Sequence, residues 1–298
     1  MADLIDLYMA QYEGRDQTRV SRLDYWRERV GKVALQDFSD DHVHQVLEDM
    51  ATRPARVYAG KDAAGRRQYV FKKHPTSAAT LNRYTAAIGA VCTFAIRKRI
   101  APKGWVHPCR SIERRPENNA RTRFLSDEEA RRLLQACRGA AWPRLYALVL
   151  LALTTGARKG ELLGLRWSDV DLEQGLATLA RTKNGSARVL PLVPAAVDEL
   201  AKFKGAPTAW VFESPRDPKR VFSFDAQWRR ALAEAKLKDV VLHTCRHTAA
   251  SMLAQAGAST VELADVLGHR DLKMVARYAH MSTGHKSALV TRVLGSLG

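Results

Sequence analysis

Apolar residues in the first hundred positions recur every three or four residues, which is the spacing of an amphipathic helix. Four stretches follow this pattern: residues 4–9, 20–30, 39–50 and 81–95. The third of them begins with a serine followed by two aspartates, which is typical of a helix start. Glycines interrupt the pattern in residues 57–71, and there we expect a small β-hairpin.

The second half of the chain predicts helices around one short hairpin. Ser126 followed by Glu129 forms the S-x-x-E pattern of a helix N-terminus, and the apolar run Leu145–Leu153 predicts a buried helix. Residues 176–192 contain two strand-like runs around an Asn-Gly pair, which favours a tight hairpin turn. From Phe224 onward the pattern is helical again. We therefore expect a fold that is mainly α-helical with a small antiparallel sheet.

The chain has 298 residues and a formal net charge of +17, and this charge is unevenly distributed. Residues 1–71 are almost balanced, whereas residues 72–123 contain 12 basic and 2 acidic side chains. The basic segment includes a proline-rich stretch, residues 102–116, which is typical of an interdomain linker. We predict a helical N-terminal domain over residues 1–115, ending in this basic linker, and a second domain over residues 120–298.

Composition restricts the classes of protein to which the chain can belong. The content of 46% hydrophobic and 27% charged residues is an ordinary globular balance, which excludes a disordered basic tail. No apolar run approaches the roughly 20 residues that span a bilayer, and the N-terminus lacks the pattern of a secretion signal. Because Cys92, Cys109, Cys137 and Cys245 form no CxxC pair, we expect free thiols in a cytoplasmic protein. Its excess of positive charge predicts a nucleic acid as the partner.

Basic side chains in and near the linker are candidates for contacts with phosphates. A basic cluster at a helix end also has an ordinary interpretation, because the helix dipole stabilises cations at the C-terminus. The position of the cluster at the linker favours contacts with DNA. The candidate DNA-binding residues are Lys72, Lys73, Arg97, Lys98, Arg99, Arg121 and Arg123.

Five short motifs in the second half of the chain occur in a fixed order. They are TTGARKGELLGLRWSDVD (154–171), TKNG (182–185), HTCRHT (243–248), LGH (267–269) and VARYAH (275–280). Each motif alone is a weak signal, but the five together, after a basic helical region, are a strong one. The set resembles the catalytic domain of the tyrosine recombinases, the phage integrase family, over about residues 120–285. The resemblance implies a helical core-binding domain followed by this catalytic domain.

The resemblance also assigns roles to residues at matching positions. Tyr278 matches the nucleophile, and the other matches to the catalytic set are Arg158, Lys183, His243, Arg246 and His269, with Glu161 as a supporting acidic residue. At Cys245 the family commonly has leucine, a difference that concerns packing rather than chemistry.

The chemistry of strand cleavage explains why these residue types are needed. A tyrosine hydroxyl can hold a phosphodiester covalently, but its pKa of about 10 keeps it protonated at neutral pH. Without a metal ion, fixed cations must stabilise the charge on the nonbridging oxygens, and the planar donors of Arg158 and Arg246 suit this role. Lys183, beside the hairpin turn, is a candidate to protonate the leaving 5′-oxygen. His243 and His269 are candidates for the base or a hydrogen-bond donor, and the sequence does not divide these roles between them.

Each of these residues also has a structural interpretation when it is read alone. Arg158 can cap a helix, a lysine beside a turn is usually solvated, and Tyr278 lies on a short amphipathic segment. His243 and His247 flank Cys245 as they would at a zinc site, but no second Cys/His pair stands nearby, so we expect no metal. The complete set in the family's order favours catalysis.

The resemblance therefore implies a site-specific DNA recombinase of a mobile element, which integrates, excises or resolves DNA through a 3′-phosphotyrosyl intermediate without a cofactor. It implies a tetramer on two paired sites in double-stranded DNA, an accessory directionality factor, and a nucleoid-associated location. A type IB topoisomerase and a non-catalytic DNA-binding regulator remain open as alternatives. The apolar tail, residues 288–294, is expected to dock on a neighbouring protomer, or else to pack on its own domain.

Overall fold

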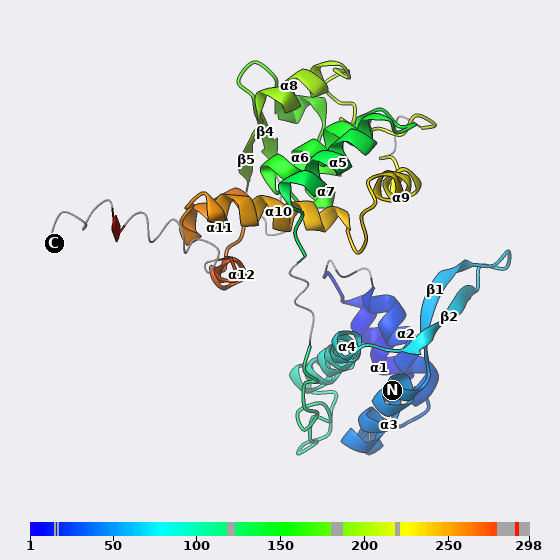
Figure 1. Ribbon diagram of the computed structural model, residues 1–298. Helices are drawn as coiled ribbons and strands as arrows, with labels where there is room; N and C mark the ends of the chain where they lie inside the picture. Colours follow the sequence, from blue (N-terminus) through cyan, green and yellow to red (C-terminus); the bar gives the residue numbers. More distant parts are fainter. Residues whose placement is uncertain are drawn as a thin grey trace. The chain divides into compact units, whose positions relative to one another are not determined.

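The structure is a computed structural model, which describes residues 1–14, 16, 18–117, 123–179, 187–217, 221–278 and 290–291 (Figure 1). The chain divides into two compact units, Met1–Ala120 and Arg121–Gly298. Within the described residues, no helix has both the length and the apolar character needed to cross a membrane.

The first unit contains helices and one hairpin, as the apolar pattern predicts. Its elements are α1 (Ala2–Ala10), α2 (Arg19–Val30), the 3-10 turn η1 (Leu35–Asp37), α3 (Asp40–Thr52), β1 (Pro54–Lys61), β2 (Arg67–Pro75) and α4 (Ala78–Arg97). The antiparallel pairing of β1 with β2 confirms the expected hairpin, which is longer than the sequence indicates.

Helix α4 is the centre of the core of the first unit. It packs against α1, α2 and α3, and its Ile88 and Val91 are fully buried. Trp26 on α2 is also fully buried, and its indole N–H donates to the carbonyl of Tyr84 at 3.0 Å. This hydrogen bond satisfies the polar atom of the largest side chain in this core. Helix α3 begins directly after Ser39, where the sequence predicts a helix start.

The second unit consists of helices around a small sheet. Its elements are α5 (Asp127–Arg138), α6 (Arg144–Thr155), α7 (Lys159–Leu163), η2 (Trp167–Asp169), β3 (Val170–Asp171), β4 (Leu176–Leu179), β5 (Arg188–Pro191), α8 (Pro194–Ala201), α9 (Asp225–Glu234), α10 (Leu242–Gln255), α11 (Thr260–Leu267) and α12 (Lys273–Ala276). The sheet is antiparallel, in the order β3-β4-β5, with Leu176 opposite Pro191 and Leu179 opposite Arg188. The strands β4 and β5 confirm the predicted hairpin, although its turn lies outside the described residues. Strand β3 has no counterpart in the sequence prediction.

Helix α6 is the buried helix that the apolar run Leu145–Leu153 predicts. It packs against α10, α5 and α8 (Figure 1). The helix ends at Gly156, whose φ of +60° lies in the left-handed region that favours glycine. A β-carbon there would lie 2.7 Å from Leu267 on α11, so the glycine also permits a close approach of the two helix ends. Cys245 is fully buried in the adjacent α10, where it takes part in packing.

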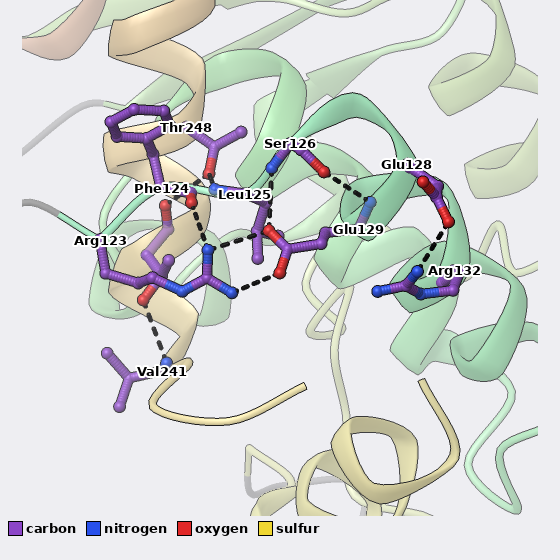
Figure 2. A network of polar contacts seen from close by, with 10 residues as sticks. Arg123, Phe124, Leu125, Ser126, Glu128, Glu129, Arg132, Val241 and Thr248 are labelled. Carbon is purple, nitrogen blue, oxygen red and sulfur yellow. Dashed lines mark hydrogen bonds and ion pairs between the residues drawn. The ribbon is translucent and has the colours of Figure 1, made fainter. Parts of the chain in front are cut away.

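The start of α5 is fixed by the predicted capping box. The Ser126 hydroxyl accepts a hydrogen bond from the Glu129 N–H at 3.2 Å, and the Ser126 N–H donates to the Glu129 carboxylate at 3.0 Å. The Arg123 guanidinium pairs with the same carboxylate at 2.6 Å (Figure 2). The Leu125 N–H donates to the Thr248 hydroxyl on α10 at 2.9 Å (Figure 2). These contacts attach the beginning of the second unit to α10, the helix that carries much of the site.

Candidate active site

Arg246 on α10 lies at the centre of the candidate site and is only 4% exposed. Its guanidinium donates to the carbonyl of Gly156 and to the carbonyl of Leu267, both at 2.6 Å. These carbonyls belong to the C-terminal ends of α6 and α11, where helix dipoles favour a cation. The two hydrogen bonds therefore fix the guanidinium between the ends of two helices.

Arg158 lies at the start of α7, directly after the end of α6, and is oriented by Glu161. Its backbone N–H donates to one Glu161 oxygen at 2.9 Å, and its guanidinium donates to the other at 2.8 Å. The guanidinium also donates to the Gly268 carbonyl at 3.2 Å. Gly268 follows Leu267 in the chain, so Arg158 and Arg246 bind neighbouring carbonyls at the end of α11.

Arg188 is a third arginine of this network, and it is not among the site residues predicted from the sequence. It begins β5, donates to the Glu161 carboxylate at 2.9 Å and to the Val266 carbonyl at 2.5 Å, and its side chain is only 10% exposed. The sequence contained a signal for this residue. Arg188 and Leu190 are two positions apart in a strand, so their side chains lie on the same face of the sheet. A charged residue on a buried face needs a partner, which is Glu161.

Two histidines lie one turn apart on α10, and one of them contacts the tyrosine. The rings of His243 and His247 have their centroids 4.8 Å apart, in an edge-to-face arrangement. His247 Nδ1 lies 2.5 Å from the Tyr278 hydroxyl. From the sequence, His247 was a candidate only for a metal ligand, although the i, i+4 spacing from His243 places both rings on one helix face. Within the described residues, no group of three or more His, Cys, Asp or Glu side chains is arranged to hold a metal ion.

Tyr278 follows α12 and is itself packed, with 8% of its surface exposed. It belongs to an apolar cluster with Ala250 and Ala254 of α10, Leu267 of α11 and Val275 of α12. Because Leu267 also supplies a carbonyl to Arg246, the tyrosine and the buried arginines lie around the same helix end. His269 follows Gly268 at this end, and its backbone N–H donates to a carbonyl of α11 at 2.8 Å.

Burial and the clustered arginines set the charges in the site. Burial, and then the charges of Arg158 and Arg188, lower the pKa of Arg246 to about 10, so it remains a cation at neutral pH. Burial and nearby cations lower the pKa of His269 to about 4, and the imidazole is therefore neutral at pH 7. Burial raises the pKa of the Tyr278 hydroxyl, against the opposing effect of Arg277 and Arg246. A site with this excess of positive charge is suited to bind an anion.

The other predicted site residues lie elsewhere in the chain. Lys183 and Arg121 fall outside the described residues. In the first unit, the predicted DNA-binding side chains are all exposed: Lys72 and Lys73 on β2, and Arg97, Lys98 and Arg99 at the end of α4. Arg123 differs from them, because its guanidinium is paired with Glu129 and with the Phe124 carbonyl (Figure 2).

Comparisons with known proteins show matches to integrases and DNA recombinases. Residues 123–285 match the model of the phage integrase family. The integrase of Salmonella phage P22 is 27% identical over 290 residues, which cover 89% of this chain and 71% of the phage protein. The shufflon-specific DNA recombinase of Escherichia coli is 34% identical over 176 residues, which cover 59% of this chain and 44% of that protein.

A solved structure has the same fold over nearly the whole chain. It is the Tn1549 transposon integrase in complex with transposon right end DNA, and it superposes with a TM-score of 0.73. The sequence identity is 17%, and the alignment covers 98% of this chain and 99% of the other. The expected fold class, mainly helical with a small antiparallel sheet, is confirmed by this likeness and by the elements described above.

Proposed function

The chain belongs to the phage integrase family and is a site-specific DNA recombinase, and we propose that Tyr278 is the nucleophile with which it cleaves DNA. The hydroxyl attacks the scissile phosphate, forms a 3′-phosphotyrosyl bond and releases a 5′-hydroxyl. Attack by the 5′-hydroxyl of another strand reverses this step. The bond energy is conserved in the covalent intermediate, so the reaction needs no ATP.

One observation carries this proposal: Tyr278 belongs to the same buried cluster as Leu267, whose carbonyl accepts a hydrogen bond from Arg246. The tyrosine and both predicted arginines lie in the same unit of one chain, around the end of α11. Each arginine is held by backbone carbonyls or by Glu161 before any phosphate arrives. Preorganised donors of this kind stabilise developing charge without having to reorient.

The arginines and His269 have separate parts in the proposed reaction. Arg158 and Arg246 bind the two nonbridging oxygens and stabilise the charge of the transition state, which typically contributes about 10²–10³ in rate for one donor. His269 is neutral at pH 7 and supplies a further hydrogen bond to the phosphate. We assign to Lys183 the protonation of the leaving 5′-oxygen, as the resemblance of its motif implies.

The partner of the enzyme is double-stranded DNA that contains a specific recombination site. The DNA in the Tn1549 integrase complex supports this assignment, as does the net charge of +17. We propose that the exposed basic side chains of β2 and the end of α4 contact phosphates, and that four protomers assemble on two paired sites. Residues 288–294 couple neighbouring protomers in this proposal, an accessory factor sets the direction, and the reaction takes place on the nucleoid.

The test is to trap covalent protein–DNA complexes on genomic fragments and to sequence the attached DNA. The wild-type protein should attach to one class of site, and Tyr278→Phe should bind the same DNA without forming an adduct. Strand exchange between two copies of the recovered site then identifies a recombinase. Relaxation of supercoils without exchange would instead indicate a topoisomerase, and binding without any wild-type adduct would indicate a regulator.

A further inference from the structure

We propose that His247 is a further catalytic residue, whose Nδ1 accepts the proton of the Tyr278 hydroxyl as the tyrosine attacks. This inference rests on the proposed function, because it takes Tyr278 as the nucleophile. The resemblance to the family offers His243 and His269 for this role. Among the described residues, the histidine within hydrogen-bond distance of the Tyr278 hydroxyl is His247 instead.

The geometry is that of an acceptor in direct contact with the reacting atom. Nδ1 and the hydroxyl oxygen are 2.5 Å apart, and the two ring centroids are 6.2 Å apart. His247 directly follows Arg246 in α10, so the same helix turn carries the proton acceptor and a cation for the phosphate. The arrangement satisfies the first requirement of a general base, which is hydrogen-bond reach to the proton that it removes.

The electrostatic surroundings determine the direction of this hydrogen bond. Burial, followed by the charges of His243, Arg277 and Arg246, lowers the pKa of His247 to about 4. The imidazole is therefore neutral at pH 7, with a free lone pair on one nitrogen. Because the phenol is protonated at this pH, its O–H donates and Nδ1 accepts. The proton of the neutral ring is thereby assigned to Nε2.

Every proton and bond is accounted for in both cleavage and joining of the strand. During cleavage the O–H bond of Tyr278 breaks and its proton moves to Nδ1, while the bond between the tyrosine oxygen and phosphorus forms. The bond from phosphorus to the 5′-oxygen breaks, and the leaving oxygen takes a proton from the general acid, assigned above to Lys183. During joining, the imidazolium of His247 returns its proton to the departing phenolate.

The low basicity of His247 requires that proton transfer and phosphoryl attack occur together. Transfer from a phenol to this imidazole is unfavourable in the empty site, because both neutral forms are favoured by burial. A bound phosphate diester brings a negative charge to the site, which stabilises the imidazolium. The tyrosine is then activated when DNA occupies the site, and not in the free protein.

The test measures single-turnover formation of the covalent adduct on the DNA recovered by trapping. His247→Ala should slow adduct formation by about 10²–10⁴-fold, the usual contribution of general acid–base catalysis, with DNA binding and thermal unfolding little changed. Incorporation of trifluorotyrosine at position 278 lowers the pKa of the phenol. It should increase the rate of adduct formation in the alanine variant at least about tenfold, because a more acidic phenol depends less on a base.

Two controls distinguish proton transfer from packing. A substrate with sulfur as the 5′-bridging atom removes the need for a general acid, so it should accelerate Lys183→Ala and leave His247→Ala slow. His247→Asn keeps an acceptor near Nδ1 but cannot take up the proton, and it should be as slow as the alanine variant.

A rate within threefold of wild type in His247→Ala would overturn the inference, as would a loss that trifluorotyrosine does not relieve. In both cases Tyr278→Phe still tests the proposed function separately. If the wild-type protein forms adducts through Tyr278, only the role of His247 fails.

Discussion

Glu161 is expected to be the residue whose charge most affects the stability of the site. Its carboxylate accepts hydrogen bonds from the Arg158 backbone and guanidinium and from the Arg188 guanidinium, and its side chain is only 6% exposed. Glu161→Gln keeps the size but removes the charge, so the buried guanidinium of Arg188 loses the carboxylate with which it forms its ion pair. Breaking a buried ion pair from one side costs about 3–5 kcal/mol, so we expect a loss of about 3 kcal/mol in the free energy of unfolding.

Urea denaturation and thermal melting measure this loss. For a unit of this size, about 3 kcal/mol corresponds to a decrease of about 6–12 °C in the melting temperature. Glu128→Gln is the matched control, because Glu128 pairs with Arg132 at 2.8 Å, close to the 2.9 Å between Glu161 and Arg188, but on an exposed helix face (Figure 2). An exposed pair of this kind contributes at most about 1 kcal/mol. If the two variants lose the same stability, the assignment of Glu161 as the buried counterion is refuted.

Two further predictions concern the elements that support the site. Gly156→Ala places a side chain at φ +60° and 2.7 Å from Leu267, and it should lower the free energy of unfolding, measured with heat or urea, by about 1–2 kcal/mol. Gly160→Ala is the control, because a β-carbon at Gly160 meets open space and should not destabilise the protein. Equal effects would contradict the left-handed helix end. The hydrogen bond from Arg123 is the main cause that lowers the pKa of Glu129 to about 2, so the stabilisation by Glu129 is present above about pH 4.5 and is lost as the pH falls towards 2. The difference in unfolding free energy between wild type and Glu129→Gln should therefore shrink over that range, and a difference independent of pH would contradict the pairing.

Local features of the fold were predictable because short-range chemistry determines them. The capping box of Ser126 and Glu129 needs only residues within one turn, and the apolar run of α6 accounts for its burial. Strand β3 has two residues and no internal period, so its pairing with β4 depends on tertiary contacts that no local pattern announces.

In the candidate site too, contacts between residues near in sequence were easier to predict than contacts between distant residues. The contact of Arg158 with Glu161 spans only three residues, and the family resemblance marks both positions. The contacts of Arg188 with Glu161 and of His247 with Tyr278 span 27 and 31 residues, and they depend on how β5 and α12 pack against the other elements of the unit. Resemblance to a family identified the expected catalytic set, but it did not indicate which histidine contacts the tyrosine.

The most direct test of the proposed chemistry is to identify the residue that carries the DNA. Trapped complexes are digested with nuclease and trypsin, and the linked peptide is sequenced by mass spectrometry. We predict a nucleotide joined through its 3′-phosphate to Tyr278, within the tryptic peptide of residues 278–286. A nucleotide on any other side chain, or strand exchange that proceeds without a protein–DNA bond, would contradict the account.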